Sequence, residues 1–266
     1  MFHQLIKYLR LFSHIQSAGI SKEIHLRANF IVTLSGSLCF FYLHLISFRL
    51  IINRFHFPGW DTGQLWVLLF TFQIFTYLAF FLFWRGLNHT PRDIGTGGFD
   101  VILAKPASAR FIAFFRNGSL HNLLSALLGA VYLSSTLIRF HLPVSFFGVV
   151  LYLTTLLLSL WIFHCLTVLF ICLNFRHGFI PGTSSVVFEI QEIYKYPANI
   201  FTSSNLWLRL LILPLSLLTT LPASAILLKP LSPNLILTYV LLFLILTVWS
   251  HLAWTSSLRH YSSASS

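Results

Sequence analysis

Charge is what this sequence has least of. Charged side chains make up 9% of its 266 residues, whereas an ordinary soluble domain carries about 25%. Hydrophobic residues account for 56% and aromatic residues for 17%. A chain with so little polar surface cannot coat a water-exposed globule, which excludes a soluble protein, and its apolar excess requires bilayer hydrocarbon. We therefore expect an all-α integral membrane protein.

Cysteine is also scarce. Its three residues, Cys39, Cys165 and Cys172, all lie within apolar runs. An odd count without metal-ligand spacing supports neither a disulfide framework nor a metal site, and we expect three small buried apolar residues. The N-terminus lacks the continuous apolar core of a signal peptide, because Lys7 and Arg10 interrupt it.

Catalytic patterns are missing too. The chain contains no HExxH, GxSxG or GxxxxGK[ST] sequence, so it offers no zinc-protease, hydrolase or P-loop signature. Asp93 and Asp100 stand alone, seven residues apart, where a magnesium-bound diphosphate would need paired aspartates. His44 and His164 lie inside apolar runs, and partners on neighbouring helices explain them better than a bis-histidine haem. We expect no catalytic residue, no metal and no cofactor.

Six stretches are long enough to cross about 30 Å of hydrocarbon, which takes about 20 residues each. They are continuous apolar runs, without the period-two alternation of β-barrel strands. We expect them to be the spans of a single transmembrane domain over residues 1–266, with cytoplasmic loops at 87–117 and 173–205. The predicted spans run roughly over 29–50, 65–86, 118–138, 146–172, 206–228 and 235–257.

Basic residues dominate the few charges, with 17 Lys and Arg against 6 Asp and Glu and a net charge of +11. They lie mainly between the apolar runs, so the positive-inside rule explains them without nucleic acid as a partner. With the N-terminus inside, only Arg49, Arg54, Arg139 and Lys229 fall outside, which leaves thirteen of the 17 in the cytoplasm. Both termini are therefore expected to be cytoplasmic, and none of the acids to lie at mid-membrane.

Residues 1–27 resemble a surface helix. Leu5, Leu9 and Phe12 recur at helical spacing, while Lys7 and Arg10 lie largely away from that face. Such an amphipathic interfacial helix would lie in the headgroup layer with its basic side toward anionic lipid. Two interpretations stay open: a simple anchoring helix, or an elbow helix that moves with a partner.

The first cytoplasmic loop contains the stretch GGFDVILAKPASARF. Its glycines allow a sharp reversal, after which Phe99, Ile102 and Leu103 would share one face of a short helix. Asp100 lies near the start of that helix, where a carboxylate suits the helix dipole, and Pro106 would end or bend it. The pattern predicts a short helix across the inner face of the membrane, with a plain amphipathic loop as the alternative.

The stretch resembles the first cytoplasmic loop of the permease subunits of ABC exporters, in the type-two membrane-domain superfamily. The similarity is to a branch of six-span proteins about as long as this chain, which show a glycine, an aspartate and L-x-R-P in that loop. The matching residues are Gly98, Asp100, Leu103, Lys105 and Pro106. A second block, from YPANIF onward, matches through Tyr196, Pro197, Arg209, Pro214, Pro222 and Ala223.

The resemblance implies the membrane-spanning permease subunit of an ATP-driven exporter in the bacterial inner membrane. A separate ABC ATPase would grip a coupling helix from Gly98 to Arg110, and the permease would pair with a copy of itself or a related subunit. Tyr196 through Pro222 would form the gating or exit region, in which Pro214 and Pro222 could break the fifth span.

The cargo expected from this resemblance is amphipathic or lipid-like, because the sequence shows no charge at mid-membrane. One departure from the family pattern is Lys105, which stands where arginine is usual and cannot make a bidentate contact. A membrane scaffold or assembly protein and an integral-membrane enzyme acting on lipid remain the alternatives.

Overall fold

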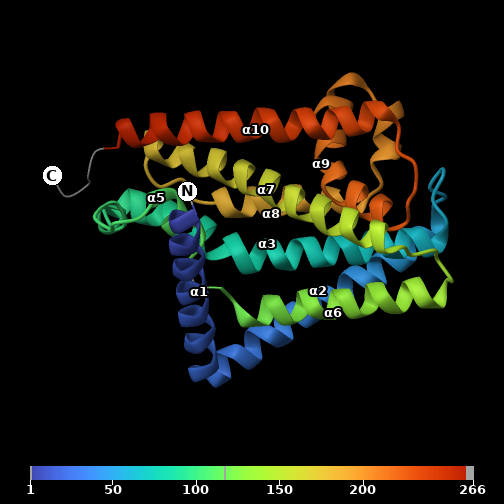
Figure 1. Cartoon of the computed structure of the whole chain (residues 1–266), viewed down its shortest axis with the longest axis horizontal. Coiled ribbons are helices and arrows are strands. Elements are labelled where there is room, and N and C mark those ends of the chain that lie inside the picture. Colours follow the sequence, from blue (N-terminus) through green and yellow to red (C-terminus); the bar gives the residue numbers. More distant parts are fainter. Residues whose placement is uncertain (1, 117, 262–266) are drawn as a thin grey trace.

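The computed structural model describes residues 2–116 and 118–261, and in this part of the chain it is helical without any strand (Figure 1). This confirms the all-α prediction. The elements, in chain order, are α1 (Phe2–His25), α2 (Arg27–Arg54), α3 (Thr62–Thr96), α4 (Asp100–Leu103), α5 (Ala109–Phe114), α6 (Leu120–Arg139), α7 (Phe146–His177), α8 (Thr183–Gln191), the 3-10 helices η1 (Glu192–Lys195) and η2 (Ala198–Ser203), α9 (Leu206–Ile226) and α10 (Pro233–Arg259).

Within the described residues, six helices are long and apolar enough to cross a membrane, as the sequence predicts. They are α2, α3, α6, α7, α9 and α10. Helix α3 is the centre of the bundle, since 72% of its most apolar window is buried, against 6% for α2. Helix α6 packs along α3, and α10 packs along α7 (Figure 1). Helix α1 runs steeply across the others, near the end of the bundle that also carries α5.

Helix α3 continues ten residues beyond the predicted end of its span at residue 86. It begins with a capping box between Asp61 and Gln64, and it ends where Gly97 adopts a left-handed conformation with φ of 79°. The continuous apolar run ends at Arg85, but a helix needs only its backbone hydrogen bonds to continue outside hydrocarbon, and Leu87 and Ile94 still bury their side chains. Because Gly97 tolerates positive φ, the chain turns sharply there.

The predicted loop 173–205 is mostly helical. After Gly178 ends α7 with φ of 73°, α8 packs against α3, and η1 and η2 pack against α9. The segment folds back into the bundle, because Val187 and Tyr194 bury their side chains there.

Two further expectations need correction. Cys165 and Cys172 are buried as predicted, but Cys39 is exposed on α2, because little of that helix is covered by the rest of the chain. Pro214 and Pro222 both lie inside α9, and the helix continues through them instead of breaking.

Candidate functional site

The turn after α3 anchors the predicted coupling segment. Phe99 is fully buried, and its ring packs against the rings of Phe175 at 5.2 Å and Tyr261 at 5.4 Å. These partners belong to the end of α7 and to the residues just after α10. The left-handed residue of the turn is Gly97, whereas Gly98, the family-matched glycine, has no positive φ. Phe99 therefore connects α4 to two of the long helices.

Helix α4 presents apolar side chains outward. Val101 is 65% exposed and Leu103 is 43% exposed, while Ile102 is buried. Of the three residues predicted to share one face, Phe99 and Ile102 are buried, whereas Leu103 lies about 100° round the helix from Ile102 and stays exposed. The outward face is apolar and lies beside Lys105.

Lys105 and Pro106 form the exposed connection between α4 and α5. Lys105 makes no side-chain hydrogen bond or ion pair with the residues that the structure describes. We call Val101, Leu103 and Lys105 the α4 surface. Its apolar side chains and lysine are the features that a contacting protein would recognise.

Two of the predicted contact residues point toward their own chain. Arg110 of α5 donates a hydrogen bond to the Ser250 hydroxyl of α10 at 3.2 Å, so its guanidinium is directed into the bundle. Asp100 lies near Tyr261, and burial, followed by interaction with Asp100, raises the pKa of that phenol to about 12. Neither side chain belongs to the α4 surface.

Helix α1 contacts this segment directly. The Lys7 ammonium donates to the carbonyl oxygen of Pro106 at 3.2 Å, and the backbone N–H of Ser108 donates to the Tyr8 hydroxyl at 3.2 Å. The Tyr8 ring also packs edge-on against Phe111 of α5, with 5.0 Å between centroids. The N-terminal helix and the α4–α5 segment are thus in contact at several points.

Glu23 is a structural residue that the sequence analysis did not single out. Its buried carboxylate accepts hydrogen bonds from Arg85 of α3 at 2.9 Å and from the backbone N–H of Leu120 at 2.8 Å, and lies 3.3 Å from the Nδ1 atom of His121. One acid at the end of α1 thereby connects α1, α3 and the start of α6. Glu23 is the one acid among several bases in residues 1–27, and this is the only feature of the sequence that pointed to it.

The predicted gating residues lie along η1, η2 and α9. Pro197 precedes η2, Tyr196 is half-buried beside it, and Arg209 is exposed near the start of α9. The backbone N–H of Ala198 donates to the Thr220 hydroxyl at 3.0 Å, so η2 packs on the later part of α9. Tyr196 is thus close to α9, whereas the structure leaves Arg209 away from this contact.

A cavity of about 730 Å³ lies between η1, η2 and the α2–α3 connection. Tyr196, Lys195 and Phe57 are among the residues that line it. Lys195 was assigned to the cytoplasmic side, whereas Phe57 belongs to the connection predicted outside. The structure brings the two to one cavity because α8 carries the chain back into the bundle.

Glu192 contacts the membrane-spanning helix α2. Its Oε1 atom lies 3.1 Å from the Nε2 atom of His44, and the Lys195 ammonium donates to Oε2 at 2.6 Å. His44 is ten residues from the end of α2, so this acid lies alongside a span and not in a loop. Glu192 therefore lies beside a candidate span, whereas the sequence analysis placed it in the loop 173–205. The sequence could not pair two residues 148 positions apart.

His164 has different surroundings. It is buried among aromatic rings, with Phe114 at 4.8 Å and Phe83 at 5.1 Å between centroids. The two intramembrane histidines thus lie in separate environments. No group of three or more His, Cys, Asp or Glu residues that could hold a metal occurs within residues 2–116 and 118–261.

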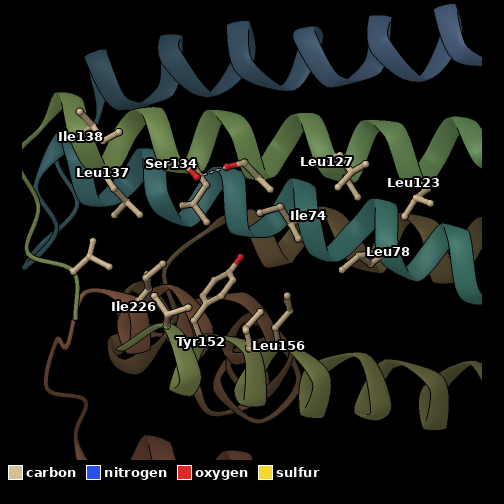
Figure 2. A pocket seen from close by; sticks show the side chains of 16 residues that line it. Ile74, Leu78, Leu123, Leu127, Ser134, Leu137, Ile138, Tyr152, Leu156 and Ile226 are labelled. Atoms are coloured by element: carbon tan, nitrogen blue, oxygen red, sulfur yellow. Dashed lines mark hydrogen bonds between the residues drawn. The ribbon is translucent and has the colours of Figure 1, made fainter. Parts of the chain in front are cut away.

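An apolar cleft of about 560 Å³ lies between α3, α6 and α7 (Figure 2). Leu127 and Leu137 of α6 and Ile74 of α3 line one side of it, and Tyr152 and Leu156 of α7 form the opposite wall (Figure 2). Ser134 turns its hydroxyl to the carbonyl oxygen of Ala130 at 2.9 Å. The cleft offers apolar contact and no cluster of reactive groups among its described lining residues.

The comparisons with known proteins agree with this architecture. A family model described as ABC-2 family transporter protein matches residues 38–265, which is most of the chain. No curated protein and no solved structure matched the sequence. The match includes α3 to α10, the α4 surface and most of α2, in a chain with six helices able to span a membrane. This multi-pass membrane protein belongs to the ABC-2 family of transporter proteins.

Proposed function

We propose that the chain is the membrane-spanning permease subunit of an ATP-driven exporter, and that a separate ABC ATPase subunit supplies the energy. The observation that carries this proposal is the α4 surface, which is exposed outward while its own backbone is anchored by the buried Phe99 ring. A short helix held in this way can transmit a push from a partner to the bundle. ATP hydrolysis then belongs to the partner and not to this chain.

The packing suggests how such a push would travel. Movement of α4 would act through Phe99 on the end of α7 and on the residues after α10. It would also act on α1 through the contacts of Lys7 with Pro106 and of Tyr8 with Ser108. In this proposal α4 is the coupling helix, and α1 is an elbow helix that moves with it.

The open side of α2 supports pairing with a second permease subunit, either a copy of this chain or a relative. Ile31, Val32 and Leu50 are each more than 60% exposed on that helix. Such side chains need either lipid or another membrane helix around them. A dimer would give two α4 surfaces for two ATPase subunits.

The proposed setting is the bacterial inner membrane, with both termini in the cytoplasm. Lys7 of α1 and Lys105 of the α4 surface lie at the same end of the bundle, since Lys7 contacts the residue after Lys105. Bases gathered at one end of a bundle favour the cytoplasmic side. The cargo is proposed to be amphipathic or lipid-like, in keeping with the apolar cleft of Figure 2.

Co-purification tests the proposal. A tagged chain, extracted in mild detergent from its native host, should retain an ATPase subunit near one-to-one by mass spectrometry. Lys105→Glu should remove most of that subunit, because it reverses the charge of the α4 surface. Lys22→Glu makes the same change on an exposed lysine of α1 and should retain it. If the folded wild-type protein carries no ATPase subunit, the exporter proposal is wrong. The alternatives, a membrane scaffold protein and a lipid-modifying membrane enzyme, then explain the chain better.

A further inference from the structure

A second cavity, of about 290 Å³, lies between α2, α3, α8 and the start of α6, and differs in character from the apolar cleft. Its wall includes the side chains of Gln73, Thr76, Gln191, His44 and Glu192. Small-molecule sites typically measure about 300–1,000 Å³, so the volume suits a small ligand or the head of a larger one. Polar groups at this depth of a membrane protein are a functional signal by default.

Several of these groups have no partner within the described part of the chain. Both amide atoms of Gln191, the Oε1 atom of Gln73, the Thr76 hydroxyl and the Nδ1 atom of His44 are buried without a hydrogen bond. The glutamines and the threonine are each more than 90% buried. Leaving one such atom unpaired costs about 1–3 kcal/mol, so a cluster of them indicates that something else satisfies them.

The unpaired atoms include two amide oxygens, those of Gln73 and Gln191, which can only accept, and the Thr76 hydroxyl, which can accept or donate. The Gln73 amide nitrogen already donates to the carbonyl of Phe41 at 3.1 Å, which leaves its oxygen as the free atom. The Nε2 atom of His44 lies 3.1 Å from the Glu192 carboxylate, and the Nδ1 atom of the same ring is the one left without a partner. A ligand that fits must therefore supply N–H or O–H donors.

Aromatic side chains form much of the remaining wall, beside polar residues that include His121 and Asn122. Phe80 of α3 and Phe188 of α8 stack with 5.6 Å between centroids, and Trp84 packs against Phe80 at 4.9 Å. All three line the cavity, together with Tyr77 and Phe40. Such faces suit an apolar or aromatic body, and they attract a cationic head placed over a ring.

We propose that this cavity is a cargo-binding site for an amphipathic amine, a molecule with an N–H-bearing head and an aromatic or alkyl body. The head meets the amide oxygens of Gln73 and Gln191, and the body lies against Phe80 and Trp84. That the ligand is a transported cargo rests on the proposed permease function. The binding itself does not.

Binding is tested on the full chain in lipid nanodiscs, without the ATPase, by calorimetric titration with 2-phenylethylamine. Its N,N,N-trimethyl derivative keeps the positive charge and the ring but has no N–H donor. The parent amine should bind saturably, and the trimethyl derivative at least fivefold more weakly. Gln191→Leu and Thr76→Val should each weaken amine binding at least fivefold, while Thr154→Val, on the exposed side of α7, should leave it unchanged.

The melting temperature separates a binding role from a structural one. Gln191→Leu removes unpaired buried polar atoms, so the ligand-free variant should melt at the same temperature as wild type or higher. A lower melting temperature with unchanged amine affinity would make Gln191 a structural residue and overturn the proposal. Absence of saturable binding to folded wild type, or equal binding of the trimethyl derivative, would overturn it as well. Binding in a chain that captures no ATPase would refute the permease function alone.

Discussion

Glu23 and Arg85 form a salt bridge of 2.9 Å that connects the surface helix α1 to the central helix α3. The Glu23 carboxylate is nearly buried, with 5% of the side chain exposed, and it also accepts the backbone N–H of Leu120. A charge in such a place is stable only while its partners stay paired. This carboxylate therefore holds the C-terminal end of α1, while Lys7 and Tyr8 hold its N-terminal half.

Glu23→Gln should destabilise the protein by about 3 kcal/mol, because it leaves the Arg85 charge without its counter-ion. Thermal unfolding in detergent, followed by tryptophan fluorescence, measures the loss. Glu189→Gln makes the same change on an exposed acid of α8 and should have little effect. Equal melting temperatures for the two variants would show that the salt bridge contributes nothing.

Phe99→Ala should cost about 3–5 kcal/mol, since it empties a fully buried site among Phe175, Trp254 and Tyr261. Val101→Ala, two residues later on the exposed face, should leave the stability nearly unchanged while reducing ATPase retention. Thermal unfolding and co-purification of both variants separate the two effects. If Val101→Ala unfolds as readily as Phe99→Ala, the assignment of buried and exposed faces on α4 is wrong.

Gly86→Ala should disturb the packing of α3 on α5. A Cβ atom at this position would lie 2.6 Å from the carbonyl oxygen of Ala113 and 2.7 Å from the Cα atom of Phe114. Because both are backbone atoms, one of the two helices would have to move to make room. We expect a loss of more than about 2 kcal/mol, seen as a lower melting temperature.

Gly36→Ala is the matched control for that substitution, because no atom lies within 4 Å of the added Cβ on α2. It should be neutral or slightly stabilising, as alanine favours a helix. A neutral Gly86→Ala would mean that α3 and α5 are not packed this closely.

The sequence was sufficient for the all-helical architecture with six candidate spans and for the turn that precedes α4. Long apolar runs bounded by bases predict spanning helices, and the glycines before Phe99 predict a turn. Both signals are local, since each depends on residues within one helix or one turn.

The side-chain partners could not be predicted because they are long-range. Arg110 reaches Ser250 across 140 positions, and His44 reaches Glu192 across 148. No local pattern placed Glu192 beside α2, because only the fold of α8 carries it there. Similarly, Leu103 and Val101 differ little in hydrophobicity from Ile102, and only packing decides which of them is buried.

Site-specific photo-crosslinking tests the central claim most directly. A benzophenone side chain placed at Val101 in the native host should capture an ATPase subunit, identified by mass spectrometry. The same group at Leu157, 66% exposed on α7, should capture none. Capture at Val101 alone is the result that the account predicts. Capture at neither position, with both variants folded and in the membrane, would contradict the assignment of the α4 surface as the ATPase contact.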